Sequence, residues 1–163
     1  MATSNVTPDG DAIISEIHIA ARPELVFQAL VDPTQVLKWW GQPGVYRCTK
    51  FQADLRVGGK WRSDGIGRDD HPFTISGEFL EVDSPRVLAY TWTATWTGEL
   101  QTIVRWELVQ KNQGTLVTLR HSGFAAHPDV RQNYRGWPAM MGWLRALVEK
   151  GETVDDRKAM PAS

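Results

Sequence analysis

The sequence predicts an α+β fold in which a series of antiparallel strands precedes one long C-terminal helix. Between residues 46 and 121, short segments alternate apolar and polar side chains and are separated by turn residues, which is the pattern of half-buried strands. After residue 127, large apolar side chains recur at alternating spacings of four and three. Those positions are Val130, Tyr134, Trp137, Met141, Leu144 and Val148. This spacing places them in one stripe along a helix, which indicates a helix that packs against an apolar surface.

The N-terminal part predicts one strand followed by two short helices. Residues 1–11 are polar and are expected to form a flexible arm. Isoleucines alternate with polar residues over 12–20, which predicts the first strand. Pro23 suits the first turn of one helix, and Asp32-Pro33 begins another.

The middle of the chain predicts the remaining strands, for a total of six or seven. The predicted strands cover residues 12–20, 46–55, 60–62, 73–82, 87–96 and 103–109, and a last strand contains Val117, Leu119 and His121. Gly58-Gly59 and Asn112-Gln113-Gly114 are typical hairpin turns. Trp92 and Trp96 are expected on one face of their strand, because the threonines between and beside them alternate to the other face.

The final helical pattern contains Gly136 and Pro138, but its phase is unchanged across them. Pro138 cannot donate a hydrogen bond to the carbonyl of Tyr134, so a kink or a short break is expected there. Residues 12–151, which contain all the predicted strands and helices, are predicted to form a single domain, and 152–163 a flexible tail.

Composition narrows the classes of function. The 163 residues include 18 basic and 19 acidic side chains, so a large basic field that would attract nucleic acid is not expected. No apolar run is long enough to insert in a membrane, and the N-terminus lacks the features of a signal peptide. The lone Cys48 cannot form an internal disulfide, which fits a reducing compartment. These features predict a cytoplasmic protein.

Several motifs along residues 12–150 resemble one protein superfamily. They are Trp39-Trp40-Gly41, Asp54-Leu55-Arg56-Val57-Gly58-Gly59-Lys60-Trp61, Gly77-Glu78-Phe79-Leu80-Glu81-Val82, His121-Ser122-Gly123-Phe124 and Gly136-Trp137. The sequence resembles the START-related, Bet v 1-like (SRPBCC) superfamily, and within it the homologues of the activator of the 90-kDa heat-shock-protein ATPase. The resemblance implies a helix-grip fold. In this fold a curved antiparallel sheet of six or seven strands wraps around the long C-terminal helix, with two short helices after the first strand.

The resemblance also implies a set of functions. Members of this superfamily bind lipids, sterols, hormones and polyketides in an internal pocket, and some act as cyclases or hydrolases. The eukaryotic co-chaperones of this branch carry an additional N-terminal domain that is missing here, so a chaperone ATPase is not the expected partner. A co-chaperone or stress-response interaction module is the third class of function, after a ligand-binding module and an enzyme.

The expected ligand is an apolar or aromatic small molecule held between the sheet and the C-terminal helix. The residues expected to bind it are Trp92, Trp96, Trp106, His121, Tyr134, Trp137 and Met141. Indole rings offer a large apolar surface and one N–H donor each, which suits stacking on a flat ligand. The same residues could instead fill a closed core, and the resemblance favours the pocket.

His121 is the titratable residue of most interest. It continues the alternation of Val117 and Leu119, so its imidazole is expected to face inward. There it could orient a ligand, act as the acid or base of a cyclase, dehydratase or hydrolase, or be a core histidine bonded to a tryptophan or the backbone. An enzyme would also need a nearby carboxylate, and Glu78 or Glu107 could supply it only if the strand register differs by one. We therefore assign no catalytic residue, and the sequence favours a binding module over an enzyme.

Trp39 and Trp40 are expected at the mouth of the pocket, at the end of the second short helix. Alternatively, Trp39 packs inward and Trp40 covers an interface between two copies of the chain. Adjacent exposed indoles are costly, so at least one of them should be buried. A homodimer is compatible with the sequence, and no metal site or cofactor is expected.

Overall fold

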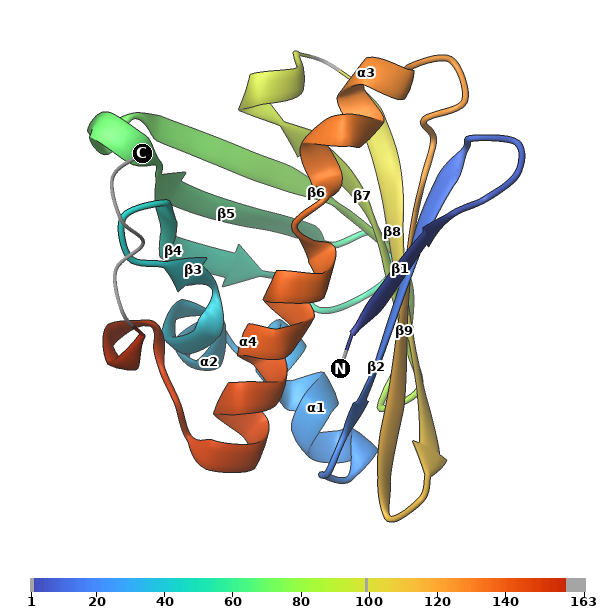
Figure 1. The fold of residues 1–163 in the computed structure, drawn as a ribbon, viewed down its shortest axis with the longest axis vertical. Helices are drawn as coiled ribbons and strands as arrows, with labels where there is room; N and C mark the ends of the chain where they lie inside the picture. Colours follow the sequence, from blue (N-terminus) through green and yellow to red (C-terminus); the bar gives the residue numbers. More distant parts are fainter. Residues whose placement is uncertain (1, 99, 158–163) are drawn as a thin grey trace.

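The computed structural model describes residues 2–98 and 100–157, and Figure 1 shows its arrangement. The strands are β1 (Thr3–Val6), β2 (Ala12–Ile19), β3 (Gly41–Gln42), β4 (Tyr46–Ala53), β5 (Lys60–Ile66), β6 (Pro72–Asp83), β7 (Val87–Ala94), β8 (Gln101–Lys111) and β9 (Gly114–Ser122). The α-helices are α1 (Pro23–Val31), α2 (Pro33–Trp39), α3 (Pro128–Arg131) and α4 (Trp137–Lys150). Short 3₁₀ helices cover Arg68–Asp70, Thr95–Thr97, Gln132–Tyr134 and Val154–Asp156.

All nine described strands form one antiparallel sheet in the order β1-β2-β9-β8-β7-β6-β5-β4-β3. The sheet curves around α4, which lies in its concave face, while α1 and α2 cover one end of that face (Figure 1). This is the α+β, helix-grip architecture that the sequence predicted. It gives α4 a sheet wall on one side and the two short helices at its lower end.

The strand count is higher than the predicted six or seven because the sequence pattern missed two short strands. Strand β3 has only two residues, too few to show an alternation. Strand β1 pairs with β2 from Thr3 opposite Glu16 to Val6 opposite Ile13, although residues 1–11 were predicted to be a flexible arm. All four β1 side chains are exposed, so the backbone ladder holds this segment without any apolar pattern in the sequence.

The predicted hairpin between β8 and β9 is confirmed. The ladder runs without a shift from Ile103 opposite Ser122 to Lys111 opposite Gly114. Asn112 and Gln113 both have positive φ, 51° and 60°, which is the conformation that a two-residue turn needs to match the strand twist.

The two predicted short helices are confirmed. Pro23 and Pro33 each occupy the first turn of their helix, and Asp32 caps α2 by accepting a hydrogen bond of 3.0 Å from the backbone N–H of Thr34. The indole N–H of Trp39 donates to the carbonyl of Ala29 over 2.8 Å. This bond joins the end of α2 to α1, so the pair forms one unit beneath α4.

The C-terminal helical pattern is interrupted, as expected, but the break precedes Pro138. Helix α3 ends at Arg131, a 3₁₀ turn follows, and α4 begins at Trp137 with Gly136 as its N-cap. Pro138 therefore lies in the first turn of α4, where its missing N–H is not needed. The stripe of apolar residues keeps its phase on both sides of this break.

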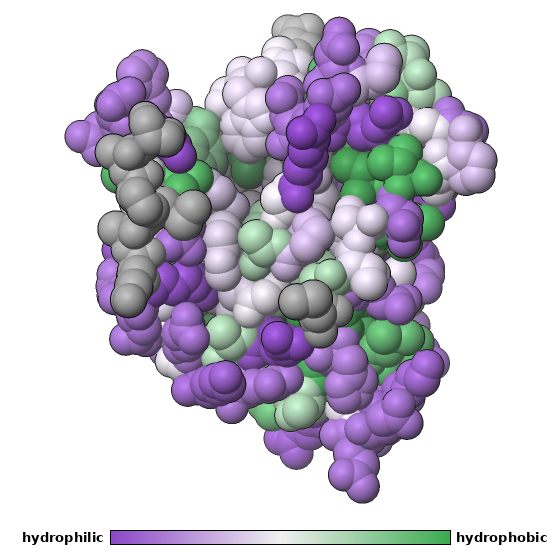
Figure 2. Space-filling model, viewed as in Figure 1, coloured by the Kyte–Doolittle hydropathy of each residue, from purple (hydrophilic) through white to green (hydrophobic). Residues whose placement is uncertain are grey.

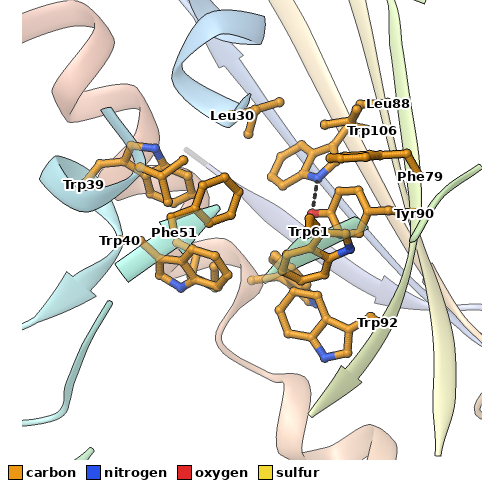
Figure 3. Close-up of a pocket in the computed structure, with 13 residues that line it drawn as sticks. Leu30, Trp39, Trp40, Phe51, Trp61, Phe79, Leu88, Tyr90, Trp92 and Trp106 are labelled. Carbon is orange, nitrogen blue, oxygen red and sulfur yellow. Dashed lines mark hydrogen bonds between the residues drawn. The ribbon is translucent and has the colours of Figure 1, made fainter. Parts of the chain in front are cut away.

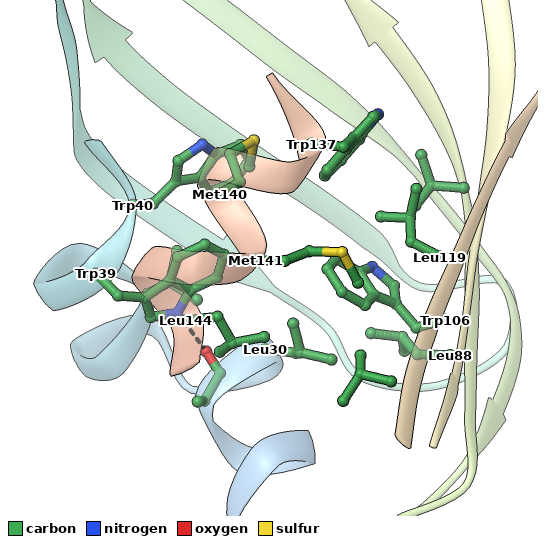
Figure 4. Close-up of a cluster of buried hydrophobic side chains, with 14 of the residues drawn as sticks. Leu30, Trp39, Trp40, Leu88, Trp106, Leu119, Trp137, Met140, Met141 and Leu144 are labelled. Carbon is green, nitrogen blue, oxygen red and sulfur yellow. Dashed lines mark hydrogen bonds between the residues drawn. The ribbon is translucent and has the colours of Figure 1, made fainter. Parts of the chain in front are cut away.

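The core lies between α4, the sheet and the two short helices (Figure 4). From α4, Trp137, Met141 and Leu144 point toward the sheet and are at most 2% exposed. Trp106 and Leu119 meet them from β8 and β9. The periodic stripe is therefore mostly core.

The segment after α4 is packed as far as it is described, in contrast to the predicted flexible tail. Val154 is 1% exposed. The Nη1 group of Arg157 donates to the carbonyls of Trp39 and Gly41 over 3.0 and 2.7 Å. The sequence did not predict this packing, because one buried residue, Val154, and one cation, Arg157, do not make a periodic pattern. The rest of the predicted tail, residues 158–163, lies outside the described residues.

Within residues 2–98 and 100–157, no helix combines the length and the apolar character of a membrane-spanning segment.

Candidate functional site

An apolar pocket opens beside the break between α3 and α4. Its volume is about 320 Å³, at the lower end of the range that small-molecule sites occupy. Its lining residues are Trp40, Tyr46, Gly67, Phe73, Ile75, Trp92, Trp96, Asn133, Tyr134, Gly136, Trp137 and Met140. None of these residues carries a charge. On the face shown in Figure 2, hydrophilic residues surround a less polar centre over α4 and the segment before it. We call the apolar pocket of about 320 Å³ the outer pocket.

A second hollow, which we call the inner cavity, lies deeper between the sheet and α2 and has a volume of about 30 Å³ (Figure 3). It is lined by Leu30, Val36, Trp39, Trp40, Phe51, Trp61, Phe79, Leu88, Tyr90, Trp92, Trp106, Trp137 and Met140. A volume of this size holds about one water molecule, whereas a benzene-sized guest needs a cavity of about 150 Å³. The core is therefore nearly filled, and the larger space lies toward the surface.

Four side chains line both hollows and separate them: Trp40, Trp92, Trp137 and Met140. Two of these are fixed by hydrogen bonds, since Trp92 donates to the Tyr134 hydroxyl over 2.9 Å and Trp137 donates to His121 over 3.2 Å. Trp40 stacks on Trp39 with ring centroids 5.9 Å apart. Met140 has three rotatable bonds and a polarizable, adaptable side chain, and it is the member of the partition most able to move.

The sheet positions the aromatic rings through one close approach. Trp61 on β5 lies opposite Gly77 on β6, and its indole N–H crosses Gly77 to donate to the carbonyl of Thr91 on β7 over 3.0 Å. A Cβ atom at position 77 would lie 1.8 Å from that carbonyl oxygen and 2.6 Å from the indole nitrogen. Glycine is therefore required at 77 for Trp61 to lie flat along the inner cavity.

His121 is fully buried and belongs to a polar network inside the core. Its Nδ1 accepts from Trp137, so its proton is on Nε2, which lies 2.7 Å from the Thr102 hydroxyl. Thr102 in turn donates to the carbonyl of Trp92 over 3.2 Å. Burial lowers the pKa of His121 to about 3, so the imidazole is neutral. Both ring nitrogens are thus occupied by protein groups.

The carboxylates that an enzyme would need do not reach His121. Glu78 lies 4.0 Å from Lys60, and Glu107 pairs with Arg105 over 3.0 Å. Both carboxylates are partly exposed, and the buried imidazole has both of its nitrogens satisfied elsewhere. The geometry is that of a core histidine bonded to a tryptophan, one of the three interpretations that the sequence left open.

The structure divides the predicted ligand-binding residues among three places. Trp92, Trp96, Tyr134 and Trp137 all line the outer pocket, and Trp92 and Trp137 line the inner cavity as well. Trp106 lines the inner cavity only. His121 and Met141 line neither hollow and are completely buried.

The alternation predicted that Trp96 continues the inward face of β7, but in the structure it does not. The strand ends at Ala94, and Trp96 lies in a 3₁₀ turn with 45% of its surface exposed. Its ring contacts Phe73 edge-on, with centroids 5.5 Å apart, and lies 6.2 Å from Tyr134. The change of backbone conformation after Ala94 therefore moves Trp96 to the rim of the outer pocket.

The two adjacent tryptophans were predicted at the mouth, but both are buried. Trp39 is 3% exposed and Trp40 is 8% exposed. Trp39 lines only the inner cavity, whereas Trp40 lies between the two hollows. Neither ring offers a surface for an interface between copies of the chain.

Several lining residues were missed by sequence reasoning. Phe73 and Ile75 alternate along the predicted strand 73–82, so a period-two pattern was available for them. Met140 follows Trp137 by three residues, which is also one helical face. Tyr46 follows a loop and had no comparable signal.

Metal-ligating side chains do not gather in the described part of the chain. No cluster of three or more His, Cys, Asp or Glu residues is present there. Cys48 is buried, with its sulfur 3.2 Å from the Ser63 hydroxyl, and burial raises the pKa of its thiol. The thiol is therefore held in its protonated, unreactive form.

Comparison with known proteins places this architecture in a family. The model of the activator of Hsp90 ATPase homolog 1-like (AHSA1-like) proteins matches residues 20–149. The chain belongs to the AHSA1-like family. The family is part of the SRPBCC superfamily, which commonly binds small hydrophobic molecules. None of the curated proteins matches the AHSA1-like sequence significantly.

Solved structures share the fold of this AHSA1-like chain at low sequence identity. Protein Ms6760 from Mycobacterium smegmatis is 19% identical with a TM-score of 0.79, and the match covers 93% of this chain and 100% of that one. Protein CV1439 from Chromobacterium violaceum is 24% identical with a TM-score of 0.74, covering 85% and 98%. DynU16, from the dynemicin biosynthetic locus, is 22% identical with a TM-score of 0.71, covering 91% of this chain and 51% of that one.

Proposed function

We propose that this protein binds an apolar or aromatic small molecule in the outer pocket. The observation that carries the proposal is the lining of that pocket: a volume of about 320 Å³ is walled by aromatic rings and contains no charged side chain. Stacking and removal of apolar surface from water are the interactions that such walls offer. The few polar groups at its rim, among them the exposed Asn133, are suited to orienting a ligand.

The energetics predict which ligands bind better. Burial of apolar surface contributes roughly 25 cal/mol per Å², so about 55 Å² of additional buried surface tightens binding about tenfold. A two-ring aromatic molecule is therefore expected to bind more tightly than its one-ring analogue. The occurrence of a structural neighbour in a biosynthetic locus agrees with a role in handling a small organic molecule.

A binding module is favoured over an enzyme that uses His121. An acid or base must reach the reacting atoms, and His121 lines neither hollow. Its two nitrogens are engaged by Trp137 and Thr102. The role that this geometry supports is to hold Trp137 in place as a wall of the pocket.

The proposal is tested by blocking the pocket with a single residue. Gly136 lines the outer pocket, and a Cβ atom built on it meets nothing within 4 Å. The variant Gly136→Phe should place a ring in the pocket and abolish binding of N-phenyl-1-naphthylamine, a neutral fluorophore that brightens in apolar surroundings. Fluorescence titration measures the dissociation constant.

A matched control lies six residues further along the chain. Gly142 on α4 also has free space around its Cβ position, but it lines neither hollow. Gly142→Phe should therefore bind the fluorophore as the unmodified protein does. If the unmodified protein does not bind the fluorophore, or if both variants bind it equally, the outer pocket is not the ligand site.

A further inference from the structure

The hydroxyl group of Tyr90 has an unused donor at the inner cavity. The indole N–H of Trp106 donates to the Tyr90 oxygen over 3.0 Å. An indole N–H can only donate, so the Tyr90 oxygen is the acceptor in this bond and its own proton is still available. Among residues 2–98 and 100–157, no group accepts that proton in a hydrogen bond. The Tyr90 oxygen faces the gap toward Leu30 and Phe51 (Figure 3).

The inner cavity contains few polar groups that could bind the Tyr90 hydroxyl proton or hold a water molecule beside it. Six tryptophans line the inner cavity, and five of them already donate their indole N–H to other protein atoms; these are Trp39, Trp61, Trp92, Trp106 and Trp137. The sixth, Trp40, is hydrogen-bonded to Tyr46. The other lining side chains are mostly aliphatic or phenyl groups. A water molecule is held well only by two to four polar partners, and here Tyr90 is the main one. A ligand atom that accepts a hydrogen bond could therefore replace a water at this position at little cost.

We propose that Tyr90 is the polar anchor of the binding site, and that the ligand carries a neutral hydrogen-bond acceptor, such as a ketone or ester oxygen, at its inner end. The proposal rests on the proposed function, because the apolar body of the ligand occupies the outer pocket. Rotation of Met140 out of the partition joins the two hollows and lets the oxygen reach Tyr90.

The inner cavity selects a neutral acceptor over a charged one. None of its lining residues carries a charge. A carboxylate would lose its hydration in exchange for one hydrogen bond, which is unfavourable in an apolar site. Burial raises the pKa of the Tyr90 hydroxyl above its ordinary value, so the group is a protonated donor throughout the physiological range.

The test compares two ligands of nearly equal shape, 2-acetylnaphthalene and 2-isopropylnaphthalene. The variant Tyr90→Phe keeps the ring and removes the donor. It should weaken binding of the ketone about tenfold and change binding of the hydrocarbon by less than about twofold. Isothermal titration calorimetry, or quenching of tryptophan fluorescence, measures both dissociation constants.

The chain offers a matched control for the loss of a phenolic hydroxyl. Tyr134 also accepts from an indole N–H, that of Trp92, but it lines the outer pocket. Tyr134→Phe should not discriminate between the two ligands. The inference is overturned if Tyr90→Phe weakens both ligands equally, or if Tyr134→Phe is the variant that loses the ketone selectively.

A second measurement needs no variant and covers the case in which Tyr90→Phe fails to fold. The infrared carbonyl band of 2-acetylnaphthalene bound to the unmodified protein should lie below its frequency in hexane, because a hydrogen bond weakens the C=O bond. An unshifted band overturns the inference while leaving the proposed function intact. Absence of binding by both naphthalenes overturns the inference, and the titration with N-phenyl-1-naphthylamine then decides separately whether the proposed function stands.

Discussion

The indole N–H of Trp137 donates a 3.2 Å hydrogen bond to Nδ1 of His121, joining α4 to β9 in the middle of the core. The bond fixes which imidazole nitrogen carries the proton, and Thr102 completes the network from β8. Trp137, which lines both hollows, is therefore held in place by a neutral histidine that lines neither of them. This relationship makes the position of Trp137 sensitive to the protonation of His121.

Stability should depend on pH through His121. Burial lowers its pKa to about 3 in the folded protein, whereas a histidine in an unfolded chain titrates near 6.5. Between these values the unfolded chain binds a proton that the folded protein does not. The free energy of unfolding should therefore fall as the pH drops below about 6.5, with a loss of about 2 kcal/mol at pH 5.

Urea denaturation at pH 8 and pH 5 measures this loss. The variant His121→Gln keeps a polar side chain at the position and has no proton to gain, so its stability should change less between the two pH values. Equal pH dependence of the variant and the unmodified protein would show that other groups govern acid stability.

Removal of the Met140 side chain should join the two hollows. Met140 is 8% exposed and lines both of them. Met140→Ala should lower the free energy of unfolding by about 2–3 kcal/mol, because buried methylene groups are lost and a cavity remains. It should also tighten binding of a three-ring aromatic hydrocarbon relative to a one-ring analogue. A loss of stability without any change in size preference would mean that the partition does not limit ligand length.

Loss of Trp96 should affect binding more than stability. Its ring is 45% exposed and contacts Phe73 at the rim of the outer pocket. Trp96→Ala should weaken binding of N-phenyl-1-naphthylamine several-fold and change the free energy of unfolding by less than about 1 kcal/mol. Val109, 56% exposed on β8, lines neither hollow, and Val109→Ala is the control that should change neither quantity. Unchanged fluorophore affinity in Trp96→Ala would remove this ring from the site.

Arg157 should contribute more to stability than the exposed cations of the chain do. Its side chain is 6% exposed, and it donates to the carbonyls of Trp39 and Gly41. Arg157→Ala should cost about 2 kcal/mol of stability, because two buried carbonyls lose a charged donor. Arg47 pairs with Asp155 in a more exposed position, and Arg47→Ala should cost less than about 1 kcal/mol. Thermal denaturation compares the two variants, and equal melting temperatures would contradict the assignment of Arg157 as an anchor.

The fold could be predicted from the sequence because its main elements follow regular periods. The strands β4 to β9 alternate side chains, and α4 carries its stripe from Trp137 to Leu144. The parts that were missed are held by the backbone or by single contacts. Strand β1 has only exposed side chains, and the segment after α4 is fixed by Val154 and Arg157. Neither kind of interaction produces a pattern along the chain.

The candidate site was predicted less completely than the fold. Periodicity identifies an inward side chain, but it does not distinguish a pocket wall from a filled core. Met141 and His121 face inward and are core, whereas their neighbour Met140 lines both hollows. That difference depends on three-dimensional packing between α4 and α2. Trp96 reached the rim through a local 3₁₀ turn that strand alternation could not predict.

The interruption between α3 and α4 has a practical consequence. Asn133, Tyr134 and Gly136 lie in this interruption and also border the outer pocket. Their amides lack the continuous i to i−4 ladder of a regular helix, so they should exchange with deuterated solvent faster than those of α4. A molecule resting on this stretch would slow that exchange locally. Deuterium uptake over these few peptide groups would therefore report occupancy directly, even for a compound that has no colour or fluorescence.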